Sequence, residues 1–189
     1  MSRKGAWGLV IALVVVLLLG LVQSEYNRLV SLTQKVKEAW AQVENVLQRR
    51  NDLIPNLVAT VKGYAKPEKE VFLQVTEARS SLMRATTVPE KVQAANQLGT
   101  AIGRLLLVVE NYPQLKANEN FLRLQDELAG TENRIAVERK RYNEAVNVYN
   151  QTAKSFPTMI FVRLFGFEPE KPYFEAAPQS TKVPEVKFE

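Results

Sequence analysis

Three polar side chains on one helix face have the types and spacing best suited to recognition. They are Arg49, Asp52 and Asn56, at i, i+3 and i+7 of a helical pattern. Four residues of a later helical stretch are placed to meet them: Asn118, Glu119, Glu132 and Asn133. Such a set either forms a polar network that fixes helix register, or lines a polar groove for a peptide or protein partner. We expect the network, which would also satisfy the carbonyl group freed by Pro55.

Composition removes the residues that most enzymes use. The chain has no histidine and no cysteine, which excludes the commonest general bases, thiol nucleophiles and ligands of transition metals. Its eight glycines are scattered and form no phosphate-binding loop. We therefore expect no catalytic residues, no metal and no cofactor.

Charge is distributed as on a solvated helical surface. The formal net charge is +5, and acidic and basic residues are interspersed along the chain. Residues 139–141 form a basic triplet, which Glu138 and Glu144 partly balance. Nucleic-acid binding calls for a concentrated basic face with interleaved aromatic residues, so we expect no nucleic-acid partner.

A second candidate surface lies near the C-terminus. Residues 160–167 form a short apolar cluster that contains Phe161, Phe165 and Phe167. The stretch that follows contains several prolines and is typical of an extended tail. The cluster either caps the end of a helical domain, or docks on a partner or the headgroup layer of a membrane. We expect capping.

The N-terminal elements predict attachment to a membrane. Residues 5–24 carry no charge, and residues 7–22 are almost entirely apolar. At roughly 1.5 Å per residue, such a helix spans the ~30 Å hydrocarbon core of a bilayer. The alternative is a cleaved signal peptide. We expect an uncleaved signal-anchor, because the run exceeds the usual apolar region of about 7–15 residues and helical spacing continues after it.

The rest of the chain predicts helices alone. From Tyr26 to about Gly63, apolar residues recur at steps of three and four, as in coiled coils, with one polar gap near Arg50. Pro55 is expected to bend this helix or end it near Ile54, and Gly63 with Pro67 gives a firmer end. Further helices are predicted over about 67–86, up to about 110, and over 118–155.

The expected fold is all-α. A transmembrane helix precedes an elongated antiparallel four-helix bundle with two long and two shorter helices. The expected division is an anchor at 1–24, the bundle at 25–157, and the apolar cluster with its tail at 158–189.

Ordered sequence blocks over nearly the whole chain resemble the LemA family of bacterial membrane-anchored proteins. The most specific block is RRNDLIPNLV at residues 49–58, between YNRLV at 26–30 and VKGYA at 61–65. Later blocks are ENYP at 110–113, LKAN at 115–118, TENRIA at 131–136 and FGF at 165–167. The resemblance implies an N-terminal anchor, a helical domain and no established catalytic activity.

Together these features predict a non-enzymatic scaffold or adaptor that binds other membrane or envelope proteins through its bundle. The alternative is a self-assembling structural protein that shapes or organises a membrane as a homo-oligomer. The expected location is the bacterial inner membrane, crossed once. Arg3 and Lys4 favour a cytoplasmic N-terminus and an extracytoplasmic bundle, although Arg28, Lys35 and Lys37 weaken that bias.

Overall fold

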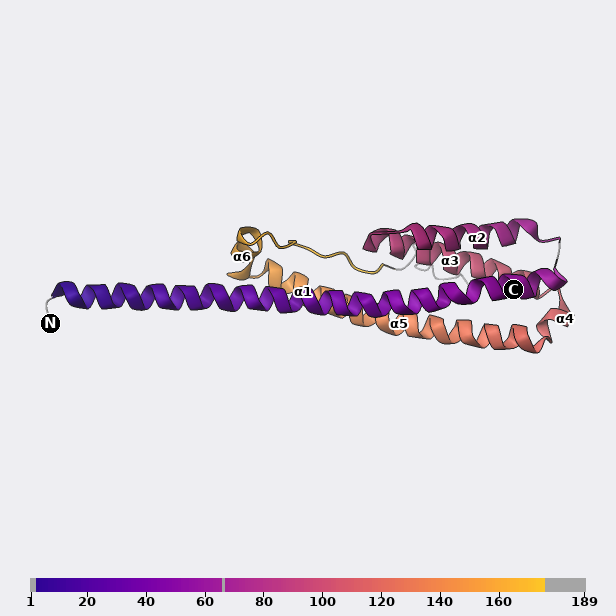
Figure 1. The fold of residues 1–189 in the computed structure, drawn as a ribbon, viewed down its shortest axis with the longest axis horizontal. Coiled ribbons are helices and arrows are strands. Elements are labelled where there is room, and N and C mark those ends of the chain that lie inside the picture. Colours follow the sequence, from indigo (N-terminus) through magenta and orange to yellow (C-terminus); the bar gives the residue numbers. More distant parts are fainter. Residues whose placement is uncertain (1–2, 66, 176–189) are drawn as a thin grey trace, which may run out of the picture. The chain divides into compact units, whose positions relative to one another are not determined.

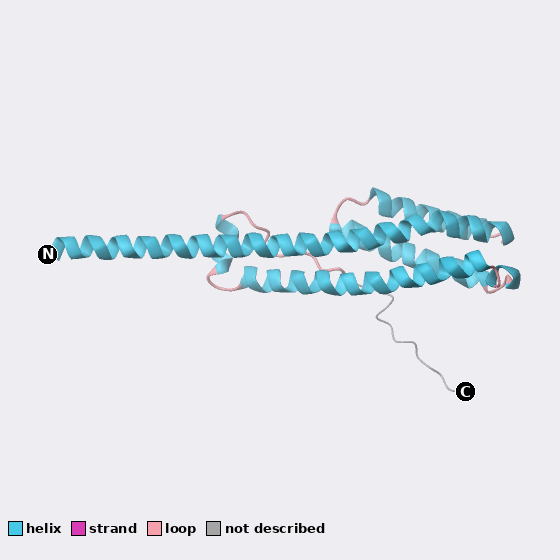
Figure 2. Cartoon of the chain, turned by 60° about the horizontal axis from the view of Figure 1, so that its bottom comes forward, coloured by secondary structure: helices cyan, strands magenta, loops and turns pink. Residues whose placement is uncertain are grey.

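The computed structural model describes residues 3–65 and 67–175. Within those ranges every regular element is a helix and no strand occurs, which confirms the all-α prediction. Figure 1 labels the helices, and Figure 2 shows the loops that join them. Their bounds are α1 Arg3–Tyr64, α2 Lys69–Arg84, α3 Val88–Val109, α4 Pro113–Lys116, α5 Glu119–Lys154 and α6 Thr158–Leu164.

Helix α1 combines the apolar run with the first predicted amphipathic helix. It continues for 62 residues without a break, as the helical spacing after the run predicts. Among the described residues, α1 is the one helix long and apolar enough to cross a membrane. In its most apolar window no side chain is buried against protein, so this stretch is not the core helix of a globular domain.

Of the predicted ends of α1, the one at Gly63 is confirmed and the one at Ile54 is wrong. The helix runs through Pro55 and stops at Tyr64. A proline inside a helix removes one backbone donor. The helix persists here because another residue supplies a donor to the freed carbonyl, as described below.

The described chain divides into two compact units to which both long helices contribute. The first unit lies within residues 1–40 and 142–171, and the second within 41–141 and 172–189. In the second unit, α2 and α3 pack together as a helical hairpin. Its core consists of apolar side chains from four helices: Val43, Leu47, Ile54, Leu57 and Val61 of α1, Phe72, Val75 and Leu82 of α2, Leu98, Ile102 and Leu105 of α3, and Phe121, Leu128 and Ile135 of α5.

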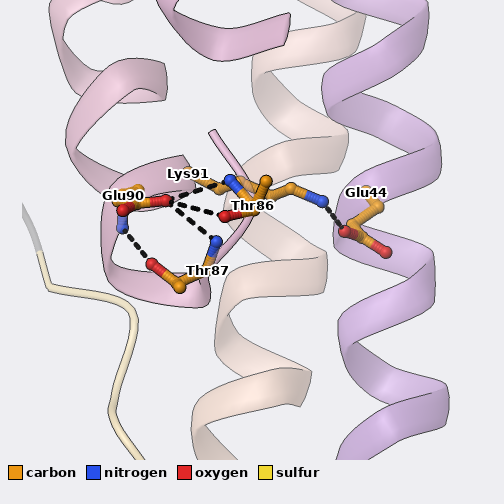
Figure 3. Close-up of polar contacts among 5 residues, drawn as sticks. All are labelled: Glu44, Thr86, Thr87, Glu90 and Lys91. Carbon is orange, nitrogen blue, oxygen red and sulfur yellow. Dashed lines mark hydrogen bonds and ion pairs between the residues drawn. The ribbon is translucent and has the colours of Figure 1, made fainter. Parts of the chain in front are cut away.

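A capping box sets the start of α3 (Figure 3). The backbone N–H of Thr87 donates to the Glu90 carboxylate at 3.0 Å, and the N–H of Glu90 donates back to the Thr87 hydroxyl. The bond from the Thr87 backbone is the main cause that lowers the pKa of Glu90. One residue further, Lys91 pairs with Glu44 of α1. The hairpin is therefore fixed to α1 by charge as well as by its apolar face.

Two short helices, α4 and α6, were not predicted. Helix α4 is a single turn in the stretch between the helices predicted to end near residue 110 and to begin at 118, and it buries Leu115 completely. Asn118 follows it and begins α5, accepting a 3.1 Å hydrogen bond from the N–H of Phe121. The Asn118 amide also donates to the Tyr64 hydroxyl at 3.1 Å. One of the predicted site residues is therefore a helix cap that links α5 to the end of α1.

Candidate functional site

An arginine occupies a core position of α1 in the second unit. Buried positions of α1 alternate steps of four and three: 43, 47, 50, 54, 57 and 61. All are apolar except Arg50, which is 9% exposed, and its neighbour Asn51 is 2% exposed. The polar gap noted in the sequence is thus a buried charge facing the core.

One carboxylate on α5 neutralises this arginine. Arg50 Nη1 donates to Glu132 Oε2 at 2.8 Å. Burial lowers the pKa of the Arg50 guanidinium, and the nearby Glu132 carboxylate opposes that shift. Arg50 Nε is buried and has no hydrogen-bond partner among the described residues. Our hypothesis is that the pair fixes the register of α1 against α5 in this unit, at some cost in stability.

A second arginine, Arg139, lines a small pocket that also contains Arg50 and Glu132. The pocket has a volume of about 280 Å³ and includes Arg50, Gly99, Glu132, Arg139 and Phe174. The Arg139 guanidinium lies 4.2 Å above the centre of the Phe174 ring. Burial lowers the pKa of Arg139 and Glu132 again opposes the shift. Phe174 is 3% exposed, so the residues after α6 contribute to this core, which the sequence did not predict.

A contact from α2 explains how α1 passes Pro55. Because proline has no N–H, the carbonyl of Asn51 loses its usual donor four residues later. Arg79 Nε donates to that carbonyl oxygen at 3.3 Å. We expected the freed carbonyl to be satisfied within the predicted polar network, and the structure instead satisfies it from α2.

The three predicted α1 residues lie beside the core rather than in it. Arg49, Asp52 and Asn56 are all exposed. Asp52 accepts a 2.8 Å hydrogen bond from Gln48, and the Asn56 carbonyl accepts one from Thr60. These bonds stay within α1. Residues 49, 52 and 56 share a face, but the apolar pattern turns residue 50 inward instead.

The predicted α5 residues take separate places. Glu119, Glu132 and Asn133 are exposed, and Asn118 is half-buried. Glu132 bonds to Arg50 and not to Arg49. Among the described residues, no hydrogen bond or ion pair joins the α5 set to Arg49, Asp52 or Asn56. A role for these exposed residues in binding a partner stays a prediction.

The aromatic cluster near the C-terminus packs against α1 in the first unit. The Tyr26 ring contacts those of Phe165 and Phe167 edge-on, with centroids 5.1 and 5.9 Å apart. Phe161 stacks on Phe165 at 6.1 Å. Gly166 has a φ of 72°, and the N–H of Phe167 donates to the carbonyl of Val162 at 2.9 Å. This glycine ends α6 and turns Phe167 toward α1.

The segment after α6 is held to α5 by a paired amide contact. The Asn150 side chain donates to the carbonyl of Lys171 at 3.0 Å and accepts from its N–H at 2.8 Å. The Tyr149 hydroxyl donates to the carbonyl of Glu168 at 2.7 Å. The sequence predicted an extended tail here, but gave no signal for its attachment to α5.

A groove of the second unit lies between α2 and α3. It has a volume of about 600 Å³. Most of its lining residues are polar or charged: Gln74, Glu77, Ser81, Gln93, Asn96, Gln97, Thr100 and Arg104, with Ala78 and Ala101. Amide, hydroxyl and charged groups of this kind form hydrogen bonds and ion pairs with a partner. The groove is suited to recognition.

Comparison with known proteins identifies relatives of this chain. A family model described as LemA family matches residues 39–188. Magnetosome protein MamQ 2 of Paramagnetospirillum magneticum is 26% identical over 179 residues, covering 81% of this chain and 65% of the relative. Protein LemA of Metamycoplasma hominis is 24% identical over 133 residues, covering 70% of this chain and 61% of the relative. This chain thus spans less than two thirds of the length of these relatives.

The contact between Arg79 and the Asn51 carbonyl predicts an energetic coupling with Pro55. Arg79→Met is expected to lower the free energy of unfolding by about 1–2 kcal/mol, because a buried carbonyl loses its donor. In a Pro55→Ala background the alanine N–H restores the helical bond. Arg79→Met should then lower the free energy of unfolding by less than about half of that amount. Denaturation of the full-length protein in detergent, followed by circular dichroism, measures both. Arg134→Met, at an exposed position of α5, is the control. Equal losses in the two backgrounds would contradict the coupling.

The buried ion pair predicts an asymmetric response to substitution. Arg50→Met is expected to leave the thermal midpoint unchanged or raise it, because methionine completes the apolar stripe. Glu132→Gln should destabilise by about 1–2 kcal/mol, since it leaves a buried cation unpaired; solvent exposure of Glu132 limits the loss. The double variant should behave like Arg50→Met. If Arg50→Met costs as much as Glu132→Gln, the pair stabilises the fold and our hypothesis is wrong.

Proposed function

Because the chain belongs to the LemA family, we propose that it is a membrane-anchored, non-enzymatic scaffold or adaptor for other membrane or envelope proteins. The observation that carries the proposal is the apolar window of α1, in which no side chain is buried against protein. A bilayer is the environment that solvates such a helix. Residues 5–24 are then an uncleaved single-pass anchor.

The finer architecture forms part of the proposal. The four longest helical segments form an antiparallel four-helix bundle beyond the anchor. The membrane is the bacterial inner membrane, and Arg3 and Lys4 favour a bundle on its extracytoplasmic side. Anchoring raises the concentration of the bundle near other membrane proteins without any chemistry.

The α2–α3 groove is the surface we propose for partner binding. Its polar lining supplies donors and acceptors, while the same two helices expose apolar side chains. Leu73 and Met83 of α2 are 67% and 62% exposed, and Leu107 of α3 is 70% exposed. Polar groups together with exposed apolar residues suit a protein partner that contributes a helix or an extended segment.

Self-assembly into a structural homo-oligomer is the second proposal. The same exposed leucines and methionine support it, because apolar side chains of this size at a helix surface also suit association between copies. Some relatives are named as magnetosome proteins, and a structural role in such an assembly is what this second proposal would share with them. Both proposals place the contact on α2 and α3, so one experiment separates them.

Site-specific photocrosslinking tests the groove. A benzoylphenylalanine probe in place of Gln97 is expected to yield a discrete crosslinked product in native membranes. The same probe in place of Arg123, exposed on α5, should yield none. Thr100→Arg, which fills the groove from an exposed position, should remove the product. The mass of the product separates the proposals, because self-assembly gives twice the mass of one chain. Equal yields from both probe positions, or no product from either, would overturn the groove as a binding surface.

A further inference from the structure

Helix α6 and the loop before it present an apolar face that none of the described residues covers. Phe156 is 79% exposed, Ile160 53% and Leu164 68%. Ile160 and Leu164 are four apart in sequence and share one side of α6, and Phe156 lies in the loop that leads into the helix. We propose that these three side chains insert into the headgroup–acyl boundary of the bilayer and form a second membrane contact beside the anchor.

The opposite face of α6 is already occupied. The Thr158 hydroxyl donates to the Glu25 carboxylate at 2.8 Å, and Phe165 packs on Tyr26. Val162 is 2% exposed. Turning α6 to bury Phe156, Ile160 and Leu164 against protein would break these contacts. Within the described part of the chain, this face is therefore available to an external partner.

The attachment points place α6 at the membrane boundary. Glu25 is the first charged residue after the apolar run, and Tyr26 follows it. Val22 and Glu25 are about 4–5 Å apart along the axis at ~1.5 Å per residue. Figure 1 shows α6 beside α1. Interfacial helices bury their apolar face about 5–10 Å into this boundary. Because α6 is tied to Glu25, it lies at that depth whichever way the anchor crosses.

Other side chains of α6 suit the same environment. Met159 is 41% exposed and adds apolar surface. Arg163 is exposed between Val162 and Leu164, where its cation is placed to meet anionic headgroups. A bilayer surface can contact both the apolar side chains, through its acyl chains, and the Arg163 cation, through its headgroups. The consequence is a contact at two points, which prevents α1 from rotating freely about its own axis in the membrane.

This inference rests on the proposed anchor, and the absence of cysteine makes both testable in one experiment. Single cysteines replace Phe156, Ile160 or Leu164 in the full-length protein and carry the fluorophore NBD. The protein is placed in nanodiscs of phosphatidylcholine and phosphatidylglycerol at 3:1, with or without bromine on the acyl chains. Val15→Cys, in the apolar run, reports anchoring. Val148→Cys, 50% exposed on α5, is the aqueous control.

Brominated lipid is expected to quench NBD at least twofold at positions 156, 160, 164 and 15, and to leave position 148 unchanged. Ile160→Ser with Leu164→Ser should at least halve the quenching at 156 without loss of helical circular dichroism, since both residues are exposed. Quenching at 15 without quenching at 156, 160 and 164 overturns the α6 contact and leaves the anchor standing. That result is also the one expected if a protein covers this face, because the discs contain lipid alone. No quenching at 15 overturns the anchor and the α6 contact together.

Discussion

The described residues leave the apolar start of α1 uncovered, and this exposure is the constraint on which the rest of the molecule depends. Eleven large apolar side chains between Trp7 and Leu21 are exposed. Burying one such side chain is worth about 1.5–3 kcal/mol, so transfer of the whole run from water to lipid is worth on the order of 20 kcal/mol. That exceeds the 5–15 kcal/mol that stabilises a typical domain. The surroundings of this run therefore decide where the protein resides.

Helix α1 is unbroken from Arg3 to Tyr64, so the apolar run and the helical domain share one helix. The helix passes Pro55 because Arg79 of α2 donates to the carbonyl that the proline leaves free. Close by, Arg50 occupies a core position and pairs with Glu132 of α5. In each contact an arginine meets a polar group. Arg79 binds the Asn51 carbonyl of α1, and Arg50 binds the Glu132 carboxylate of α5. We interpret the Arg50–Glu132 pair as trading some stability for a defined pairing of α1 with α5, whereas the Arg79 contact stabilises α1 at Pro55.

The end of α1 was readable from the sequence because local chemistry decides it. Gly63 with Pro67 ends α1, whereas the capping box of Thr87 and Glu90 that begins α3 was not predicted. The polar site around Arg50 was harder to predict from the sequence. The apolar steps around residue 50 contained the signal for a buried arginine, but the shared face of Arg49, Asp52 and Asn56 pointed to their exposed flank. Helix α6 and the attachment of residues 168–171 to α5 depend on contacts between residues far apart in sequence, which no local pattern reports.

The intact mass of the protein recovered from membranes tests the uncleaved anchor most directly. Retention of residues 5–24 predicts that the full chain of 21.4 kDa stays in the membrane fraction after extraction at alkaline pH. Recovery of a shorter chain that begins near residue 25, in the soluble fraction, would contradict the anchor and identify the run as a signal peptide.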